Sequence, residues 1–193
     1  MRTLIYTAFV SLDGVVDSPG GGSRSEDHRS GGWTFKDIEF LPEAYEIKGR
    51  ESEEATALMF GRTSYEAFSP LWPDMEDFAS LKDMPKYVVS TTLGEDALVG
   101  NWGDITILRS VEDVAKLKET VGGPIVIHGS ATLARTLSDA GLIDRYHLLV
   151  FPLLLGAGKR MFSDADKDKQ MLKVVESKTY ANGITKLVYD IVR

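Results

Sequence analysis

The chain has 193 residues, a formal net charge of −7 and no cysteine. This length suits one domain, so we treat residues 1–193 as a single domain. The lack of cysteine excludes disulfides, thiolate metal sites and cysteine nucleophiles. The acidic balance provides no basic stripe of the kind that nucleic-acid-binding proteins carry.

The apolar segments are too short for a membrane span. The longest, residues 146–155, has about half of the ~20 residues that a span requires. The apolar N-terminal stretch lacks the small-residue cleavage site of a signal peptide. We therefore expect a cytoplasmic protein whose partner is a small molecule, with neither nucleic acid nor a membrane as partner.

Strands and helices are predicted to alternate in the first part of the chain. A buried strand covers residues 2–11 and is followed by a polar, glycine-rich segment, residues 12–33, of a length typical of functional loops. Next come a charged helix over residues 43–57, a short strand over 58–60 and a helix over 63–68.

The second part of the chain continues this alternation and ends in a hairpin. Strands are predicted over residues 86–90, 105–108, 124–128, 144–153, 171–180 and 184–192, and helices over 111–120 and 131–140. Asn182-Gly183 is a strong signal for a turn between the last two strands. The predicted fold class is α/β, a mixed and mostly parallel sheet of about eight strands with flanking helices and a C-terminal antiparallel hairpin.

Several familiar kinds of site are missing from the sequence. His28, His128 and His147 lie far apart and lack the spacing of zinc ligands, so we expect no metal. Gly158-Lys159 resembles the end of a P-loop but lacks its first glycine and its magnesium-binding hydroxyl. Neither a G-x-S-x-G elbow nor a dinucleotide-binding G-x-G-x-x-G follows the first strand.

Small and hydroxyl residues gather where three predicted strands end. Free N–H groups at a helix start, close backbone approach at glycine and nearby hydroxyls all suit a phosphate. Because parallel strands end at one edge of a sheet, these turns suit a dinucleotide, although each turn alone is also explained as a helix cap. The three turns are Gly61-Arg62-Thr63-Ser64, Ser90-Thr91-Thr92 and Gly129-Ser130-Ala131-Thr132.

Five segments in register resemble the dihydrofolate reductase-like superfamily. The likeness is greatest to the branch that holds the reductase domain of bacterial riboflavin biosynthesis, the RibD C-terminal domain-like branch. The segments are Ser11-Leu12-Asp13-Gly14, Met59 to Glu66, Val88-Val89-Ser90, Ile125 to Leu133, and Leu142-Ile143-Asp144 through Phe162.

The resemblance implies an NADPH-dependent reductase that transfers a hydride to a small heterocyclic or imine-like substrate. Such an activity is similar to that of the 5-amino-6-(5-phosphoribosylamino)uracil reductase of riboflavin biosynthesis. A non-catalytic nucleotide-binding module that retains the fold and a true dihydrofolate reductase are the alternatives. The resemblance also implies a homodimer.

The same resemblance assigns the parts of the cofactor site. The turns at residues 61–64 and 129–132 would hold phosphates, and Arg62, with Thr91 or Thr92, would lie near the 2′-phosphate. The nicotinamide would lie near Val10 and Val16. Residues 13–33 would take the place of the family's mobile active-site loop.

Candidate substrate-facing residues follow from the resemblance as well. Asp13 is the first candidate for substrate contact or proton relay, and a turn-forming role is its alternative. Trp33 would close over the bound ring or anchor the loop. His128 stands where the family has a glycine or an acidic residue that faces substrate. The buried carboxylate that dihydrofolate reductases carry at the start of their first helix has no aligned counterpart, although Asp37 and Glu39 lie nearby.

Overall fold

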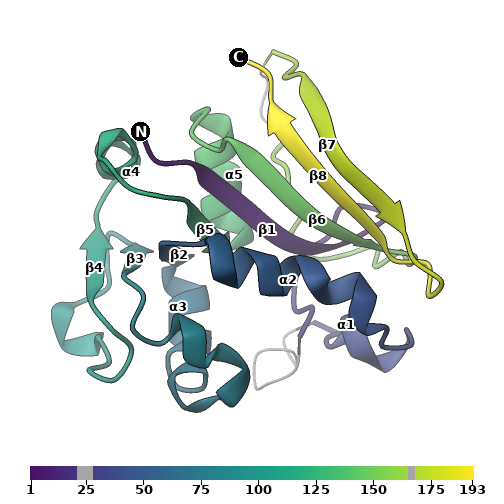
Figure 1. The fold of residues 1–193 in the computed structure, drawn as a ribbon, viewed down its shortest axis with the longest axis horizontal. Helices are drawn as coiled ribbons and strands as arrows, with labels where there is room; N and C mark the ends of the chain where they lie inside the picture. Colours follow the sequence, from purple (N-terminus) through teal and green to yellow (C-terminus); the bar gives the residue numbers. More distant parts are fainter. Residues whose placement is uncertain (21–27, 165–167) are drawn as a thin grey trace.

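The computed structural model describes residues 1–20, 28–164 and 168–193, and in these the fold is built on one eight-stranded sheet (Figure 1). The strand order is β4-β3-β2-β5-β1-β6-β8-β7, with parallel pairing from β4 to β6 and antiparallel pairing of β6, β8 and β7. The predicted mixed sheet with its closing hairpin is confirmed. The strands are β1 (Leu4–Ser11), β2 (Ala57–Gly61), β3 (Lys86–Val89), β4 (Ile105–Leu108), β5 (Ile125–His128), β6 (Arg145–Phe151), β7 (Leu172–Thr179) and β8 (Thr185–Ile191).

Helices cover both faces of this sheet. In Figure 1, α2 crosses the front of the sheet and α5 lies behind it. The helices are α1 (Trp33–Lys36), α2 (Pro42–Glu54), α3 (Arg62–Phe68), α4 (Val111–Glu119) and α5 (Ala131–Asp139), and the short 3-10 turns are η2 (Trp72–Asp74), η3 (Glu76–Leu81) and η4 (Glu95–Ala97).

The predicted elements differ from the observed ones mainly before β2. The helix predicted from residue 43 begins at Pro42, whose fixed φ and missing N–H suit the first helical position, and it continues through Gly49. The short helix α1 begins at Trp33, where only the end of a loop was expected. Residues 21–27 of the predicted loop over 12–33 lie outside the described residues.

Alternation along the strands divides the core into two faces. Tyr6 and Met59 point to the face that α4 and α5 cover. Ile5 and Phe60 point to the opposite face, where they pack with Trp102 and other aromatic residues. Because side chains alternate along a strand, each central strand buries side chains on both faces of the sheet. The faces are therefore occupied by the core, and the ends of the strands are left to form the site.

Two glycines provide a matched test of the backbone. Gly49 lies inside α2, and a Cβ added there would meet nothing within 4 Å. Gly183 turns the β7–β8 hairpin with φ of 84°, and a Cβ there would lie 3.0 Å from Pro152 Cγ. We expect Gly49→Ala to raise the free energy of unfolding by about 0.5–1 kcal/mol. We expect Gly183→Ala to lower it by about 1–2 kcal/mol. Urea denaturation measures both, and equal effects of the two substitutions would contradict the assigned backbone conformations.

Candidate functional site

A cavity of about 920 Å³ lies at the carboxyl ends of β2, β3 and β5. All three turns that the sequence singled out line it. The structure therefore brings together every residue expected to bind the cofactor, namely Gly61, Arg62, Thr63, Ser64, Ser90, Thr91, Gly129, Ser130, Ala131 and Thr132.

The hydroxyl of Ser130 joins two of these turns. Its Oγ accepts a hydrogen bond from the backbone N–H of Gly61 at 2.8 Å and donates to Oγ of Ser64 at 2.7 Å. A Cβ on residue 61 would lie 2.6 Å from Ser130 Oγ, so glycine is required for this approach. The β2–α3 turn and the β5–α5 turn are thus held as one unit.

The start of α5 lines the cavity and has no side-chain cap. Ser130 occupies the N-cap position but makes no side-chain capping bond, so the first-turn N–H groups of α5 have no partner in the helix. Gly129 and Ser130 both have positive φ, 65° and 60°. The left-handed conformation is costly for serine and is found at ligand-binding turns. The helix dipole adds partial positive charge at this point of the cavity.

Three basic side chains lie around the same cavity. The guanidinium of Arg62 donates to Thr92 Oγ1 at 2.8 Å and to Glu66 Oε1 at 2.7 Å. Arg109 donates to the carbonyl oxygens of Ser90 and Leu93, and Lys159 completes the set. Arg109 was not among the residues predicted from the sequence. Its position directly after the predicted strand 105–108, at the shared edge of the sheet, was the available signal.

The segment after β1 forms another wall. Residues 16–20 line the cavity, and the N–H of Val16 donates to the carbonyl of Lys159 at 2.9 Å. Val16 therefore lies at the cavity as expected. Val10 does not line it, because its side chain is buried among the residues that pack against α5.

The contacts of Asp13 favour the turn role over the catalytic one. Its carboxylate accepts hydrogen bonds from the Ser11 hydroxyl at 2.6 Å and from the backbone N–H groups of Leu155 and Gly156. The Ser11 bond and these amides lower the pKa of Asp13 to about 2. A carboxylate that is ionised, accepts three hydrogen bonds and does not line the cavity fastens the 153–156 segment to β1 and is a poor proton donor.

Trp33 is placed as an anchor. Its side chain is buried, Nε1 donates to the Asp17 carbonyl at 2.8 Å, and the ring packs edge-on against Phe151 at 5.2 Å. It does not line the cavity, so the expectation that it covers a bound ring has no support here. The anchoring alternative accounts for these contacts.

His128 is the last residue of β5 and faces α2, away from the phosphate turns. The imidazole lies 5.5 Å from the Trp72 ring and 6.4 Å from the Phe60 ring. Burial lowers the pKa of His128 to about 4, against an opposing effect of nearby Glu51. The ring is therefore neutral at physiological pH.

A buried carboxylate does exist, at a position that the sequence analysis did not find. Glu51, in the last turn of α2, accepts from Thr7 Oγ1 at 2.7 Å and from His147 Nδ1 at 2.9 Å. Burial alone would raise its pKa, but the charge of Lys48 and these hydrogen bonds hold the pKa below its ordinary value. The signal was its spacing from Ala44 and Ile47, which places it on the buried side of α2.

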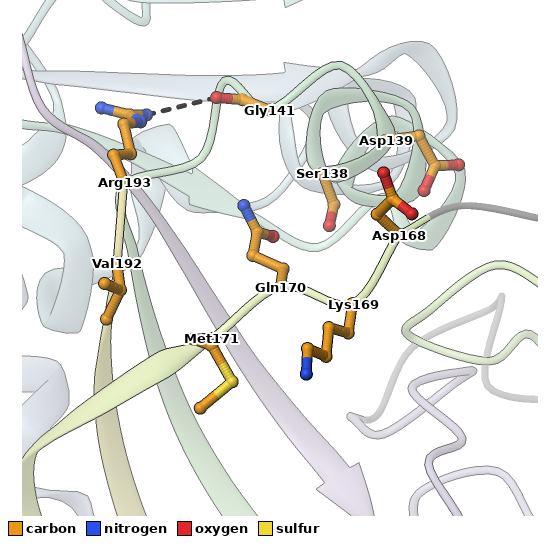
Figure 2. Close-up of a pocket in the computed structure, with 9 residues that line it drawn as sticks. All are labelled: Ser138, Asp139, Gly141, Asp168, Lys169, Gln170, Met171, Val192 and Arg193. Carbon is orange, nitrogen blue, oxygen red and sulfur yellow. Dashed lines mark hydrogen bonds between the residues drawn. The ribbon is translucent and has the colours of Figure 1, made fainter.

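A second cavity, of about 830 Å³, is lined by the end of α5, the segment before β7 and the residues after β8 (Figure 2). It adjoins the carboxyl end of α5, where the helix dipole is negative, and it includes Asp139 and Asp168. Arg193 donates to the Gly141 carbonyl at 3.2 Å and pairs with Asp144 at 2.7 Å. The lining balances Asp139 and Asp168 with Lys169 and Arg193, so it lacks the surplus of positive charge found in the first cavity.

The described residues hold neither a cluster of metal ligands nor a membrane-spanning helix. In residues 1–20, 28–164 and 168–193, no three histidine or acidic side chains come close enough together to hold a metal ion. In the same ranges, no helix has the length and apolar character needed to cross a bilayer.

Comparisons with known proteins agree with the fold. The family model of the RibD C-terminal domain matches residues 2–186. The uncharacterized protein YyaP of Bacillus subtilis is 32% identical over 200 residues, which cover 97% of this chain and 94% of YyaP.

Three solved structures share the dihydrofolate reductase-like fold and each aligns with 99% of this chain. A putative riboflavin biosynthesis protein from Shewanella sp. PV-4 has a TM-score of 0.71 at 19% identity, with 99% of its own chain covered. A dihydrofolate reductase from Enterococcus faecalis complexed with NADP(H) has a TM-score of 0.58 at 15% identity, with 97% covered. A pyrimidine reductase-like protein from Corynebacterium diphtheriae has a TM-score of 0.57 at 13% identity, with 92% covered.

The lowered pKa of His128 predicts how stability depends on pH. Between about pH 4 and 6.5, the unfolded chain binds a proton at this residue that the folded protein does not bind. The free energy of unfolding should therefore rise with pH across this window. We expect His128→Phe, which suits the aromatic surroundings, to flatten the rise. Urea denaturation across the window checks this, and an equally steep rise in the variant would contradict it.

Proposed function

The chain belongs to the RibD C-terminal domain family, and we propose that it acts as an NADPH-dependent reductase on a small heterocyclic or imine-like substrate. The observation that carries this proposal is the joining of two glycine turns by Ser130 at the edge of one cavity. An activity similar to that of the 5-amino-6-(5-phosphoribosylamino)uracil reductase is the specific form we propose.

The residues present fit the charge of NADPH. The cofactor carries a diphosphate and a third phosphate, while the chain has a net charge of −7. Attraction must therefore be local. The uncapped start of α5 provides N–H donors, and the side chains of Arg62, Arg109 and Lys159 provide positive charge around the cavity. The missing Cβ at Gly61 and at Gly129 leaves room for the hydroxyls of Ser130 and Ser64, so the two turns pack closely at the edge of the cavity.

When bound, NADPH supplies the hydride, and the protein supplies binding and orientation. The Ser130 bridge fixes the spacing between the two turns, so their donors are arranged before a ligand arrives. The wall formed by residues 16–20 limits access from one side of the cavity. Such preorganisation lowers the cost of ordering groups on binding.

The alternatives predict different outcomes of one assay. A non-catalytic module would bind NADPH without oxidising it. A true dihydrofolate reductase would oxidise NADPH with dihydrofolate, whereas our proposal predicts faster oxidation with the aminouracil precursor of riboflavin. Glu51 lies in the last turn of α2, away from the start of the first helix where dihydrofolate reductases carry their carboxylate, and this disfavours folate. The homodimer stays a prediction.

Gly61→Val tests the phosphate site. The new side chain would displace the Ser130 hydroxyl and separate the two turns. We expect NADPH affinity to fall about 100-fold, or about 2.7 kcal/mol, with the fold retained. Energy transfer from tryptophan to NADPH measures the affinity, and circular dichroism confirms folding. Gly49→Ala is the control, and unchanged affinity in Gly61→Val would show that the phosphates bind elsewhere.

Arg109→Met and Arg62→Met test which side chain meets the 2′-phosphate. NADPH and NADH differ only in that group, so losing its partner should weaken NADPH by about tenfold and leave NADH unchanged. We expect this pattern for at least one of the two variants. Titration of both cofactors against each variant provides the measurement. If both variants lose affinity for NADPH and NADH equally, neither arginine binds the 2′-phosphate.

A further inference from the structure

A lysine side chain is fully buried at the start of β3. Lys86 is 0% exposed and is among the largest side chains in the core. Within the part of the chain that the structure describes, its ammonium forms no ion pair with a carboxylate. Lysine is seldom fully buried unless it is paired, because a charge removed from water requires other partners.

Three backbone carbonyl groups take the place of a carboxylate. Nζ of Lys86 donates to the carbonyl oxygens of Leu81 at 2.7 Å, Lys82 at 2.6 Å and Met84 at 2.7 Å. These oxygens belong to the end of η3 and to the turn between η3 and β3. The three carbonyls match the three N–H donors of an ammonium one for one. The charged side chain therefore closes the turn over residues 81–84 around itself.

The indole ring of Trp102 contacts the same ammonium. Nζ of Lys86 lies 5.0 Å from the ring, within the range of a cation–π interaction. Trp102 is 0% exposed, and its Nε1 has no hydrogen-bond partner among the residues that the structure describes. Since no hydrogen bond fixes the ring there, its position depends on packing and on the cation.

Trp102 packs in turn against both ends of the β2–α3 turn. Its ring stacks on Phe60 at 5.3 Å and on Tyr65 at 6.1 Å. Phe60 directly precedes Gly61 and Tyr65 directly follows Ser64, so the two stacked rings flank one of the turns proposed to hold phosphate. A shift of the indole ring therefore acts on both ends of that turn.

Loss of one proton leaves the ammonium site unsatisfied. A neutral amine has two N–H donors and a lone pair, so it satisfies two of the three carbonyl oxygens and directs the lone pair at the third. It also loses the electrostatic attraction to the indole ring. Burial lowers the pKa of Lys86 to about 8, against an opposing effect of Asp83. The change therefore falls close to physiological pH.

The elements around Lys86 surround it with mostly uncharged groups, among the residues that the structure describes. Asp83, from the turn, is the charged group that acts on the ammonium. The neighbours in register on β2 and β4 are the apolar Leu58 and Ile105. The segment before β4 provides the indole ring and the carbonyl of Asp104, which accepts from the Lys86 N–H at 2.8 Å.

We propose that Lys86 is a pH-sensitive support of the β2–α3 turn, and that loss of its proton rearranges this turn and weakens NADPH binding there. The identity of the ligand rests on the proposed function. In the protonated state, the ammonium closes the turn over residues 81–84 and holds the Trp102 ring in place. In the neutral state, one carbonyl is released, and the ring and the residues that it flanks shift.

NMR titration of the wild-type protein tests this without any variant. We expect the ¹³Cε signal of Lys86 to titrate with a midpoint near pH 8. The carbonyl carbons of its three acceptors, the indole of Trp102 and the amides of residues 61–64 should shift with the same midpoint. Lys116, whose side chain is 77% exposed, is the comparison in the same spectra. If Lys86 keeps its proton up to the same pH as Lys116, or if residues 61–64 do not shift with it, the proposal is wrong.

NADPH titration at pH 7 and pH 9 tests the effect on binding. We expect the affinity of the wild-type protein to fall about fivefold between the two pH values. Lys86→Met has no proton to lose, so its affinity should be lower than that of the wild-type protein at pH 7 and equal at both pH values. Lys116→Met is the matched control and should follow the wild-type profile. Circular dichroism confirms folding, and a wild-type profile in Lys86→Met overturns the proposal.

The two experiments separate this inference from the proposed function. If residues 61–64 shift with Lys86 but NADPH binds at neither pH, the proposed function fails and the pH-sensitive support of the turn stands. If NADPH binds equally well at pH 7 and pH 9, the proposed function stands and the role of Lys86 in binding is overturned.

Discussion

One serine hydroxyl holds the candidate site in its shape. Ser130 Oγ bonds both the Gly61 amide and the Ser64 hydroxyl, and so joins two turns that are almost 70 residues apart in the chain. To do this, Ser130 takes a left-handed backbone conformation and leaves α5 without a side-chain cap. The left-handed backbone and the missing cap both lower the stability of the fold, and together they leave the first N–H groups of α5 free at the cavity. The position of Gly61 follows from the same bond, since any side chain there would occupy the place of the hydroxyl.

Successive residues at the end of β5 face two different environments, the positively charged cavity and the buried carboxylate under α2. Gly129 and Ser130 belong to the cavity with the arginines, where the local charge is positive although the whole chain is acidic. His128, one residue earlier, faces α2 and the enclosed carboxylate Glu51. A reductase of the proposed kind must hold a cofactor and a second ring in adjacent places. The alternation of side chains along one strand provides that division without further elements.

The sequence predicted the fold well, because its signals were local. Strand ends marked by glycine and hydroxyl residues, and the Asn182-Gly183 turn, depend only on neighbours in the chain. The ten residues expected at the cofactor turns all line one cavity, since parallel strands must end at a common edge.

The sequence failed where contacts join distant elements. Glu51, Thr7 and His147 come from α2, β1 and β6, and no spacing within one segment connects them. Asp13 was open to a catalytic and a turn-forming role, and the partners that favour the turn role lie in the distant 153–156 segment. Trp33 was open to two interpretations that only its burial could separate. In each case, the deciding fact is a hydrogen bond or a packing contact between distant parts of the chain.

Amide hydrogen exchange with and without NADPH tests the central claim most directly. If the two turns joined by Ser130 hold the cofactor, protection should increase at residues 62–64 and 131–133, the first turns of α3 and α5, which have no side-chain cap. The second cavity, near residues 138–141 and 168–171, should exchange at an unchanged rate. Protection confined to that second cavity, or none at either turn, would contradict the account.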